Sequence, residues 1–467
     1  LYFASETKTL LPFLNLVDIN FEALNDYLTF QFCLAGKTLF KGVSELLPGH
    51  YLVAQNNNLS IKRYWEVHYQ PNYDYTAKFY RNRLYELLAD SVKLHLRSDV
   101  PVGAYISGGL DSSAVASLAK RLSSDDLVGF TGKFSFSRDY DESHYARAVS
   151  EYNHFTLHEI DITANDFIDN IRKVIYHLDQ PAAGPGSFPQ FMVSKLAAQH
   201  RKVVLGGQGG DEIFGGYTRY LIAYFEQCIK AAIDDTTHNG NFIVTYESII
   251  PNLSALKNYK PLLKEFWRDG LFDEMDMRYF RLINRAPDLK DLIQWDQLGV
   301  YSPFETFKTL FYGANVGKQS YFDLMTHFDF KTLLPALLQV EDRMSMAHGL
   351  ESRVPLLDHT LVEFAATIPA DIKFKNGEMK YIFKQAIIDL LPEVITQRKD
   401  KMGFPTPLNE WLQGPLYEFV QDIFASQKSL TRSWVDNSRV RSMIAKDKKF
   451  GRNSWALLSL ELWQQEF

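Results

Sequence analysis

The sequence predicts an α/β protein, in which a main domain built on a parallel sheet with added helices follows a small β-rich segment. Three observations support this fold class. From about residue 77, short apolar stretches alternate with helix-compatible ones, and two of the apolar stretches run directly into glycine-rich loops. The first 66 residues instead carry short apolar runs separated by turn residues. Because strands that alternate with helices form parallel sheets, we expect a ligand site at their carboxyl ends.

The β-rich segment is expected to contain a hairpin. Residues 50–55 and 59–65 flank asparagines at 56–58 and have the short, apolar character of paired strands. The polar stretch 68–76 is the expected linker to the main domain.

The main domain begins with a predicted amphipathic helix, because Leu84, Leu88 and Val92 repeat every four residues after residue 77. The pattern then predicts, in order, strand 100–106, helix 114–122, strand 127–134, helix 141–152, strand 155–162, helix 166–178, helix 188–200 and strand 202–205. Residues from about 220 to 325 have a mostly helical pattern.

The first glycine-rich loop, residues 107–113, reads Ser-Gly-Gly-Leu-Asp-Ser-Ser. Glycines allow close backbone approach, and the N–H groups at the start of the following helix favour an anion. Asp111 can stand beside a phosphate only by holding a metal or a donor, so the loop predicts a site for a magnesium nucleotide. The spacing differs from that of the Walker loop. The alternative is an ordinary tight turn that is capped by Ser or Asp.

The second loop follows strand 202–205 and has six glycines within residues 206–217, around Asp211 and Glu212. Each glycine raises the entropy cost of folding, so this run is hard to explain as scaffold. The acids are suited to a metal. The alternative is a flexible linker.

Two stretches of the last third also stand out. Residues 340–358 alternate acids and bases in an apolar setting, which favours a paired network, and His348 within them is more simply explained as a hydrogen-bonded core histidine than as a catalytic one. Lys399 and Lys401 precede Gly-Phe-Pro at 403–405, which favours a fixed loop.

Composition excludes several classes of function. The 467 residues carry a formal net charge of −6, which gives no reason to expect nucleic-acid binding. Cys33 and Cys228 form no disulfide framework or metal spacing, so we expect a reducing, cytoplasmic compartment. No apolar run approaches the roughly 18 residues of a membrane helix. The expected partners are small molecules, and a homodimer is compatible with the sequence.

Taken in order, these stretches resemble the asparagine synthetase family over nearly the whole chain. The resemblance rests on the loops at 107–113 and 206–217, Arg-Met-Ser-Met-Ala at 343–347, Leu-Glu-Ser-Arg-Val-Pro-Leu-Leu-Asp at 350–358, and the Lys399 loop. It implies a parallel-sheet ATP pyrophosphatase domain at 79–467, a linker at 67–78 and a partial glutaminase domain at 1–66.

The resemblance also implies a two-step reaction. ATP adenylates a carboxylate, aspartate in the namesake enzyme, and releases pyrophosphate; ammonia then attacks the acyl-adenylate and AMP leaves. The nitrogen would come from glutamine in an intact protein, or from free ammonia in this chain.

The resemblance implies roles for the residues that match the family's motifs. Asp111 and Asp211 would bind Mg²⁺, Arg343 would lie near the acyl substrate, and Lys399 would stabilise transition-state charge. The residues expected to bind ATP and pyrophosphate are Tyr105, Ser107, Gly108, Gly109, Asp111, Ser112, Gly132, Gly206 and Gly207.

Gln208 departs from the family pattern, since many members carry a Glu there as the base for the incoming nitrogen. Glutamine cannot accept a proton at neutral pH. Either ammonia enters neutral, or Glu341, Asp342 or Glu351 takes over as base. This departure weakens the assignment of aspartate as the acceptor.

The start of the chain is a second departure. Residues 2–6 and 47–51 resemble the closing part of the glutaminase domain, whereas the part with the N-terminal nucleophilic cysteine is missing. Cys33 has no free α-amine and cannot substitute for it. The expectation is a truncated amidotransferase or, alternatively, a synthetase fed by free ammonia or a separate glutaminase.

Other functions stay open at this point. A related enzyme could form a lactam or amidate a cell-surface precursor, because acceptor choice depends on few contacts. A non-catalytic nucleotide-binding relative is disfavoured, because Asp111, Asp211 and Lys399 are all present.

Overall fold

A computed structural model describes most of the chain. The residues outside its description are 124, 138, 234–262, 264–265, 269, 271–272, 376, 399–405 and 445–451, and the side chains of 228 and 231–233. The predicted site residue Lys399, together with Lys401, therefore lies outside the described residues.

The main domain is built on a five-stranded sheet with the order β5-β4-β3-β6-β7. All four pairings are parallel, which confirms the predicted α/β class. The strands are β3 (Val102–Tyr105), β4 (Val128–Lys133), β5 (Thr156–Asp161), β6 (Val203–Leu205) and β7 (Glu351–Arg353). Strand β7 was not predicted, because it has only three residues and carries charges at both ends.

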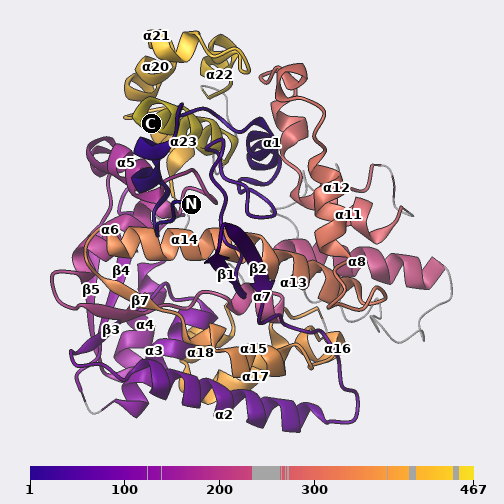
Figure 1. Cartoon of the computed structure of the whole chain (residues 1–467). Coiled ribbons are helices and arrows are strands. Elements are labelled where there is room, and N and C mark those ends of the chain that lie inside the picture. The colour runs from indigo at the N-terminus through magenta and orange to yellow at the C-terminus, as the bar shows by residue number, and fades with distance from the viewer. Residues whose placement is uncertain are drawn as a thin grey trace.

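Helices cover both faces of the sheet (Figure 1). On one face α3 (Leu110–Leu122) and α4 (Ser143–Asn153) contact the strands, and α2 (Ala77–His95) packs behind α3. On the other face α6 (Ser187–Ala197) contacts β4 and β5, and α14 (Leu333–Met346) contacts β7 and α6. The helix α5 (Ala164–Leu178) packs on α6 and α14.

The predicted amphipathic helix is α2. Thr76 caps its first turn by accepting a hydrogen bond from the Phe79 N–H at 3.3 Å. Leu84, Leu88 and Val92 are all buried, as their four-residue spacing predicts. This helix thus places the start of β3 against the main core.

The remaining helices surround this layered centre. Their bounds are α7 (Gly210–Phe214), α8 (Thr218–Ile233), α11 (Met275–Ile283), α12 (Pro303–Phe311), α13 (Tyr321–Lys331), α15 (His359–Ala365), α16 (Ala370–Lys373), α17 (Tyr381–Ile387), α18 (Glu393–Thr396), α19 (Leu408–Leu412), α20 (Tyr417–Ala425), α21 (Gln427–Leu430), α22 (Asn437–Ile444) and α23 (Arg452–Glu466); short 3₁₀ turns η3 (Ala286–Leu289), η4 (Trp295–Leu298), η5 (Pro355–Leu357) and η6 (Ile388–Leu390) join them. Among the described helices, none has the length and apolar character needed to cross a membrane.

The first 65 residues are less β-rich than predicted. The hairpin is confirmed as β1 (His50–Gln55) and β2 (Asn58–Arg63), but a 3₁₀ turn η1 (Thr7–Phe13) and a helix α1 (Phe21–Phe30) precede it. Asn20 caps α1, and the helix buries most of its side chains, so tertiary packing outweighs the turn signals around it.

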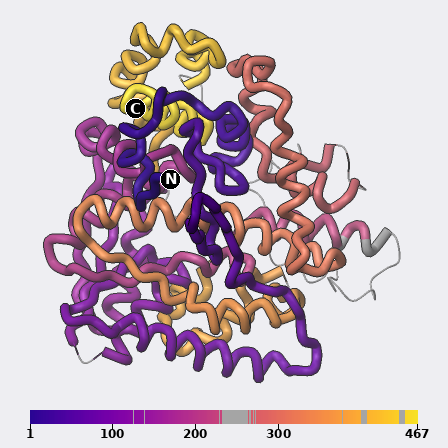
Figure 2. The backbone as a smooth tube through the Cα atoms, in the orientation of Figure 1, coloured from indigo at the N-terminus to yellow at the C-terminus, as the bar shows by residue number. Residues whose placement is uncertain are grey.

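Helix α1 shares its core with the far end of the chain. The Tyr27 hydroxyl donates to the Ala456 carbonyl of α23 at 3.2 Å and lies 2.9 Å from the Ser459 hydroxyl. Figure 2 shows the indigo N-terminal tube beside the yellow C-terminal helices. The segment after β2 is also fixed, since the Tyr69 N–H donates to the Asn315 carbonyl at 2.8 Å.

Candidate active site

The two glycine-rich loops meet at the point where the strand order reverses. Strands β4 and β5 extend from one side of β3, whereas β6 and β7 extend from its other side. The chain leaves β3 into the loop at 107–109 and leaves β6 into the loop at 206–209. In open parallel sheets a ligand crevice forms outside the carboxyl ends of the strands at such a switch point.

The loop after β3 is shaped to receive an anion. Gly108 has φ of 70°, which favours glycine. The Ser107 and Ser112 hydroxyl oxygens lie 2.9 Å apart and the Gly109 N–H donates to the Ser107 Oγ at 3.3 Å. Within the described chain no side chain caps α3, so its first N–H groups and its positive end face the loop.

The two loops pack backbone against backbone. A Cβ placed on Gly207 would lie 2.5 Å from the Ser112 nitrogen, and one on Gly206 would lie 2.7 Å from the Glu341 Oε1. Gly210 is equally tight against the Asp111 side chain. Glycine is therefore required here by close approach rather than by flexibility. The structure brings the predicted residue Gly207 to the loop of Asp111 and the predicted residue Gly206 to Glu341.

We expect Gly207→Ala to separate the two loops, because its new methyl group would overlap the Ser112 backbone. Overpacking of this kind typically costs about 1–3 kcal/mol of folding free energy. The expected result is weaker binding of ATP with a moderate drop in melting temperature. Gly186→Ala is the matched control, because no atom lies within 4 Å of the added Cβ. Unchanged ATP binding by Gly207→Ala would contradict the close packing of the loops.

Asp111 and Asp211, the two predicted metal ligands, converge on one cation. The Lys380 Nζ lies 2.5 Å from the Asp111 Oδ2 and also pairs with the Asp211 Oδ1. The Lys380 side chain is 4% exposed, and its backbone holds φ of 55° at the start of α17. A non-glycine residue in this conformation stores strain, which is typical of functional sites.

This donor set fits Mg²⁺. Two carboxylates from different loops already accommodate a positive charge, and oxygen is the ligand that Mg²⁺ prefers. Within the described residues there is no group of three or more His, Cys, Asp or Glu side chains placed to hold a metal. Magnesium at this place would thus take the two carboxylates and complete its shell with water and phosphate oxygens, as is usual for this ion.

Gln208 contacts one of the three acids considered as a substitute base. Its Nε2 lies 3.4 Å from the Glu341 Oε2, and the Ser352 hydroxyl donates to the Glu341 Oε1 at 2.6 Å. Burial raises the pKa of the Glu341 carboxyl above its ordinary value. Asp342 and Glu351 are exposed and pair with arginines instead, so Glu341 is the acid that the structure places beside Gln208.

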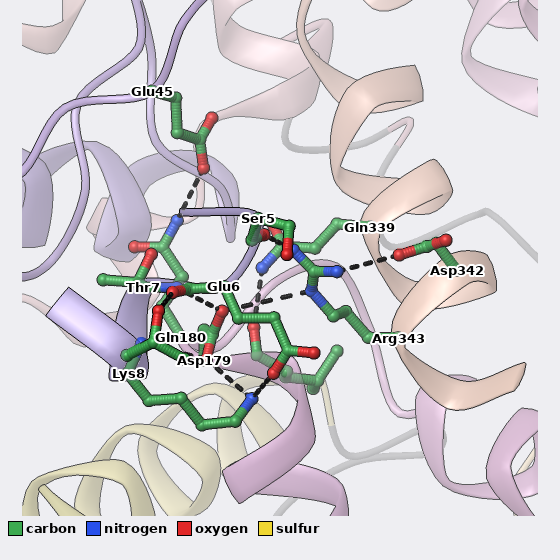
Figure 3. Close-up of polar contacts among 12 residues, drawn as sticks. Ser5, Glu6, Thr7, Lys8, Glu45, Asp179, Gln180, Gln339, Asp342 and Arg343 are labelled. Atoms are coloured by element: carbon green, nitrogen blue, oxygen red, sulfur yellow. Dashed lines mark hydrogen bonds and ion pairs between the residues drawn. The ribbon is translucent and has the colours of Figure 1, made fainter. Parts of the chain in front are cut away.

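Arg343 contacts the N-terminal segment. Its guanidinium donates to the Ser5 carbonyl and to Asp342, and its Nε lies 4.0 Å from the Asp179 Oδ2 (Figure 3). Arg343 follows Glu341 by two residues, a rotation of about 200° around a helix, so the two side chains leave α14 on different sides. The expected placement of Arg343 near the acyl substrate stays a prediction.

Asp179 anchors the same N-terminal segment. Its carboxylate accepts hydrogen bonds from the Thr7 N–H at 2.7 Å and from the Lys8 Nζ at 3.0 Å. Next to it, the Gln180 amide lies 3.2 Å from the Glu45 carboxylate (Figure 3). The loop after α5 and one side of α14 therefore contact residues 5–8 and Glu45 of the N-terminal segment.

We expect Arg343→Gln to loosen this segment, because it removes the cation beside Asp179 and the contact to Ser5. Hydrogen bonds to charged groups contribute about 1.5–3 kcal/mol, so amide exchange across residues 5–9 should accelerate roughly tenfold. Hydrogen exchange read by mass spectrometry measures this change. Arg353→Gln, whose guanidinium pairs with the exposed Glu351, is the control. Equal exchange in both variants would contradict an anchoring role of Arg343.

Two further predicted residues lie at the strands themselves. Tyr105 ends β3, and its hydroxyl lies 2.8 Å from the Ser194 hydroxyl, so its side chain packs against α6. Gly132 lies in β4 opposite Ile160 of β5. Their roles toward a nucleotide stay predictions.

Sequence reasoning missed Lys380. It lies 269 residues from Asp111, directly before α17, and no motif spacing links it to either loop. The only local signal is a lysine next to a glycine turn at 377–380, which is common on protein surfaces.

Comparisons with known proteins identify the family of both parts of the chain. A family model described as asparagine synthase matches residues 83–465, and one described as a glutamine amidotransferase domain matches residues 1–65. A glutamine-hydrolysing asparagine synthetase of Bacillus subtilis is 29% identical over 473 residues, covering 99% of this chain and 71% of the relative. A putative asparagine synthetase of Mycobacterium tuberculosis is 29% identical over 489 residues, with the same coverage of both chains.

More distant matches are also found. An amidase of Penicillium rubens is 23% identical over 464 residues, covering 88% of this chain and 66% of the relative. Among solved structures, the NH₃-dependent NAD synthetase of Campylobacter jejuni is 18% identical with a TM-score of 0.25, covering 45% of this chain and 96% of that one.

The asparagine synthase match spans the whole parallel sheet and both glycine-rich loops. It confirms the predicted ATP pyrophosphatase type of fold. The chain therefore belongs to the asparagine synthase family and is an ATP-dependent ligase that forms carbon–nitrogen bonds.

Proposed function

We propose that this chain amidates aspartate to asparagine through an acyl-adenylate, with AMP and pyrophosphate as products. The observation that carries the proposal is the convergence of Asp111, Asp211 and Lys380 at the carboxyl ends of β3 and β6, where Gln208 also contacts the buried Glu341. The first group suits phosphate chemistry and the second suits proton transfer to or from an amine. The predicted binding residues of both loops and Mg²⁺ belong to this proposal.

Adenylation would take place at the loop of residues 107–113. The open N–H groups at the start of α3 bind phosphate oxygens, and the Ser107 and Ser112 hydroxyls donate to them. Mg²⁺ held by Asp111 and Asp211 would neutralise part of the negative charge of the phosphates. Lys380 lies between the same carboxylates, so its ammonium is placed to stabilise the charge that grows on pyrophosphate as it leaves.

Amidation would take place at Gln208 and Glu341. The Gln208 amide donates to Glu341 through its nitrogen, which leaves its carbonyl oxygen able to accept a hydrogen bond from an amine. When ammonia attacks the acyl carbon, the tetrahedral intermediate must lose one proton before AMP leaves. Glu341 is a stronger base than an ordinary carboxylate, because burial raises its pKa. We propose that Glu341 accepts the proton that the intermediate loses.

The nitrogen source in this proposal is free ammonia, or ammonia from glutamine where a complete glutaminase acts. Cys33 does not supply a nucleophile: its thiol donates to the Ala23 carbonyl at 3.6 Å, and burial raises its pKa well above the ordinary value. A thiol in this state holds too little thiolate to react.

The test is pyrophosphate release with ATP and Mg²⁺ in the presence of aspartate and ammonium, aspartate and glutamine, or no acceptor. Release that requires aspartate and ammonium, with asparagine as the product, supports the proposal. Release with another carboxylate but not with aspartate would favour an amidating enzyme of different acceptor, which the Gln208 departure also suggests. Absence of release with every carboxylate offered would contradict an active synthetase.

A further inference from the structure

Arg398 is a buried cation that contacts the phosphate loop from outside the proposed catalytic group. It lies just beyond α18, and its side chain is 4% exposed. Its contacts reach two other parts of the fold, the loop at 107–109 and the start of α4.

Contacts with Gly108, Glu142 and Tyr145 hold the guanidinium. One terminal nitrogen donates to the Gly108 carbonyl at 3.1 Å, and the other pairs with the Glu142 carboxylate just before α4. The guanidinium carbon lies 3.8 Å from the centre of the Tyr145 ring. The guanidinium of arginine is planar, so it can donate in two directions and stack on a ring at once, which the ammonium of lysine cannot do.

The loop needs such a contact because Gly108 and Gly109 are adjacent glycines. Each has wide conformational freedom, so the peptide between them can rotate at low cost. In a trans peptide the carbonyl oxygen and the next N–H point in opposite directions. Holding the Gly108 carbonyl toward Arg398 therefore turns the Gly109 N–H toward the Ser107 hydroxyl, where it is found at 3.3 Å.

Tyr145 closes the other side of this peptide. A Cβ on Gly108 would overlap the Tyr145 Cβ, so the α4 backbone lies directly against the loop. The Tyr145 ring thus supports Arg398 while its main chain supports Gly108. The start of α4 and Arg398 together leave the Gly108–Gly109 peptide one orientation.

We propose that Arg398 is a positioning residue for nucleotide binding: it holds the Gly108–Gly109 peptide in the orientation that the phosphate loop needs. This inference rests on the proposed function, in which the loop binds ATP. Arg398 acts through the carbonyl of Gly108, and its charge is matched by Glu142, so it is not itself a phosphate ligand.

The alternative, that Arg398 binds phosphate directly, makes an opposite prediction for Glu142. Removing the Glu142 charge would free the guanidinium and tighten phosphate binding if Arg398 were a ligand. If Arg398 is a positioning residue, Glu142→Gln loosens its placement and weakens binding instead. Glu142→Gln also tests the proposal should an Arg398 variant fail to fold.

The experiment compares Arg398→Lys, Glu142→Gln and the control Arg147→Lys. Arg147 lies on α4 and, like Arg398, pairs with a glutamate, but its two-point pair with Glu159 lies on an exposed surface. Calorimetry measures the Kd of ATP with Mg²⁺ and of inorganic pyrophosphate. Loss of a charged hydrogen bond predicts roughly tenfold weaker binding for Arg398→Lys, a smaller weakening for Glu142→Gln and no change for Arg147→Lys.

Two further readouts separate positioning from general destabilisation. The KM for ATP should rise in Arg398→Lys while the KM for the carboxylate acceptor changes less than about twofold. Amide exchange across residues 107–110 should accelerate in Arg398→Lys and not in Arg147→Lys. Tighter pyrophosphate binding by Glu142→Gln, or unchanged exchange and binding in Arg398→Lys, would overturn the proposal.

The exchange measurement also distinguishes two kinds of failure. If the unmodified protein binds neither ATP nor pyrophosphate, the proposed function fails. Faster exchange of residues 107–110 in Arg398→Lys would still show that Arg398 orders the loop, whereas unchanged exchange would overturn that role too.

Discussion

Lys380→Met is expected to slow pyrophosphate release by about a hundredfold to a thousandfold, the usual cost of removing one preorganised charge from a transition state. The same change leaves Asp111 and Asp211 facing each other without their shared ammonium. Breaking a buried ion pair by removing one partner typically costs about 3–5 kcal/mol, so the melting temperature should fall as well.

Magnesium should partly reverse this loss of stability, because a divalent cation would bind the carboxylates that the lysine leaves behind. Thermal melts with and without MgCl₂ measure the effect, which should be larger in Lys380→Met than in the unmodified protein. Lys384→Met is the control: Lys384 lies on the same helix α17 but pairs with Glu378 at the surface. An equal magnesium effect in all three proteins would contradict a shared site for the ammonium and the metal.

A double variant separates charge balance from catalysis. Asp111→Asn combined with Lys380→Met removes one charge of each sign, so it should be more stable than Lys380→Met alone. Its pyrophosphate release should stay at the background rate, since both a proposed metal ligand and the cation are gone. Activity in this double variant would remove Asp111 and Lys380 from the mechanism.

The parts of the site that could be predicted from sequence are those that lie within one continuous stretch. The loops at 107–113 and 206–217 each combine a strand end, glycines and an acid over a few residues, so local rules are enough to place them. Their mutual contact depends on β3 and β6 being neighbours in the sheet, and that order comes from the structure and not from the sequence pattern.

Lys380, Arg398 and β7 could not be predicted in this way. The two basic residues meet the loop through the packing of the C-terminal helices. No motif marks Lys380, and Arg398 directly precedes the Lys399 loop, which the sequence singled out for its lysines. Strand β7 is short, and it is stabilised by its pairing with β6 rather than by the strand propensity of its own residues. Helix α1 is similar, since its burial against α23 explains it better than its local sequence.

Helix α14 links the two groups of observations. Glu341 leaves one side of it toward Gln208 and Ser352, whereas Arg343 leaves another side toward Ser5 and Asp179. The motif at 343–347 therefore lies between the synthetase site and the segment that matches a glutamine amidotransferase domain. Of these two residues, Arg343 begins that motif and Glu341 precedes it by two positions.

Glu341→Gln is expected to separate the two half-reactions. Adenylation does not use Glu341 in the proposed mechanism, so pyrophosphate release in the presence of aspartate should persist. Asparagine formation should fall by about 10²- to 10⁴-fold, the typical contribution of a general base. Glu351→Gln, which alters an exposed acid on β7, is the control. If both steps fall together, Glu341 supports the site only structurally.

The pH dependence gives an independent check on Glu341. Burial raises its pKa in the folded protein above the ordinary value of 4.5, so the folded state binds this proton more tightly than the unfolded state does. The contribution of this group to the free energy of unfolding is then fully present below pH 4.5, and it is lost as the pH rises through the pKa of the folded state. Amidation should change in the opposite direction, because the base works only when ionised.

Glu341→Gln should therefore abolish both trends together, with a flatter stability curve in urea titrations and no rise of amidation over the same pH range. A stability curve that keeps its slope in this variant would show that another buried group carries the titration, and the proton transfer would have to be reassigned.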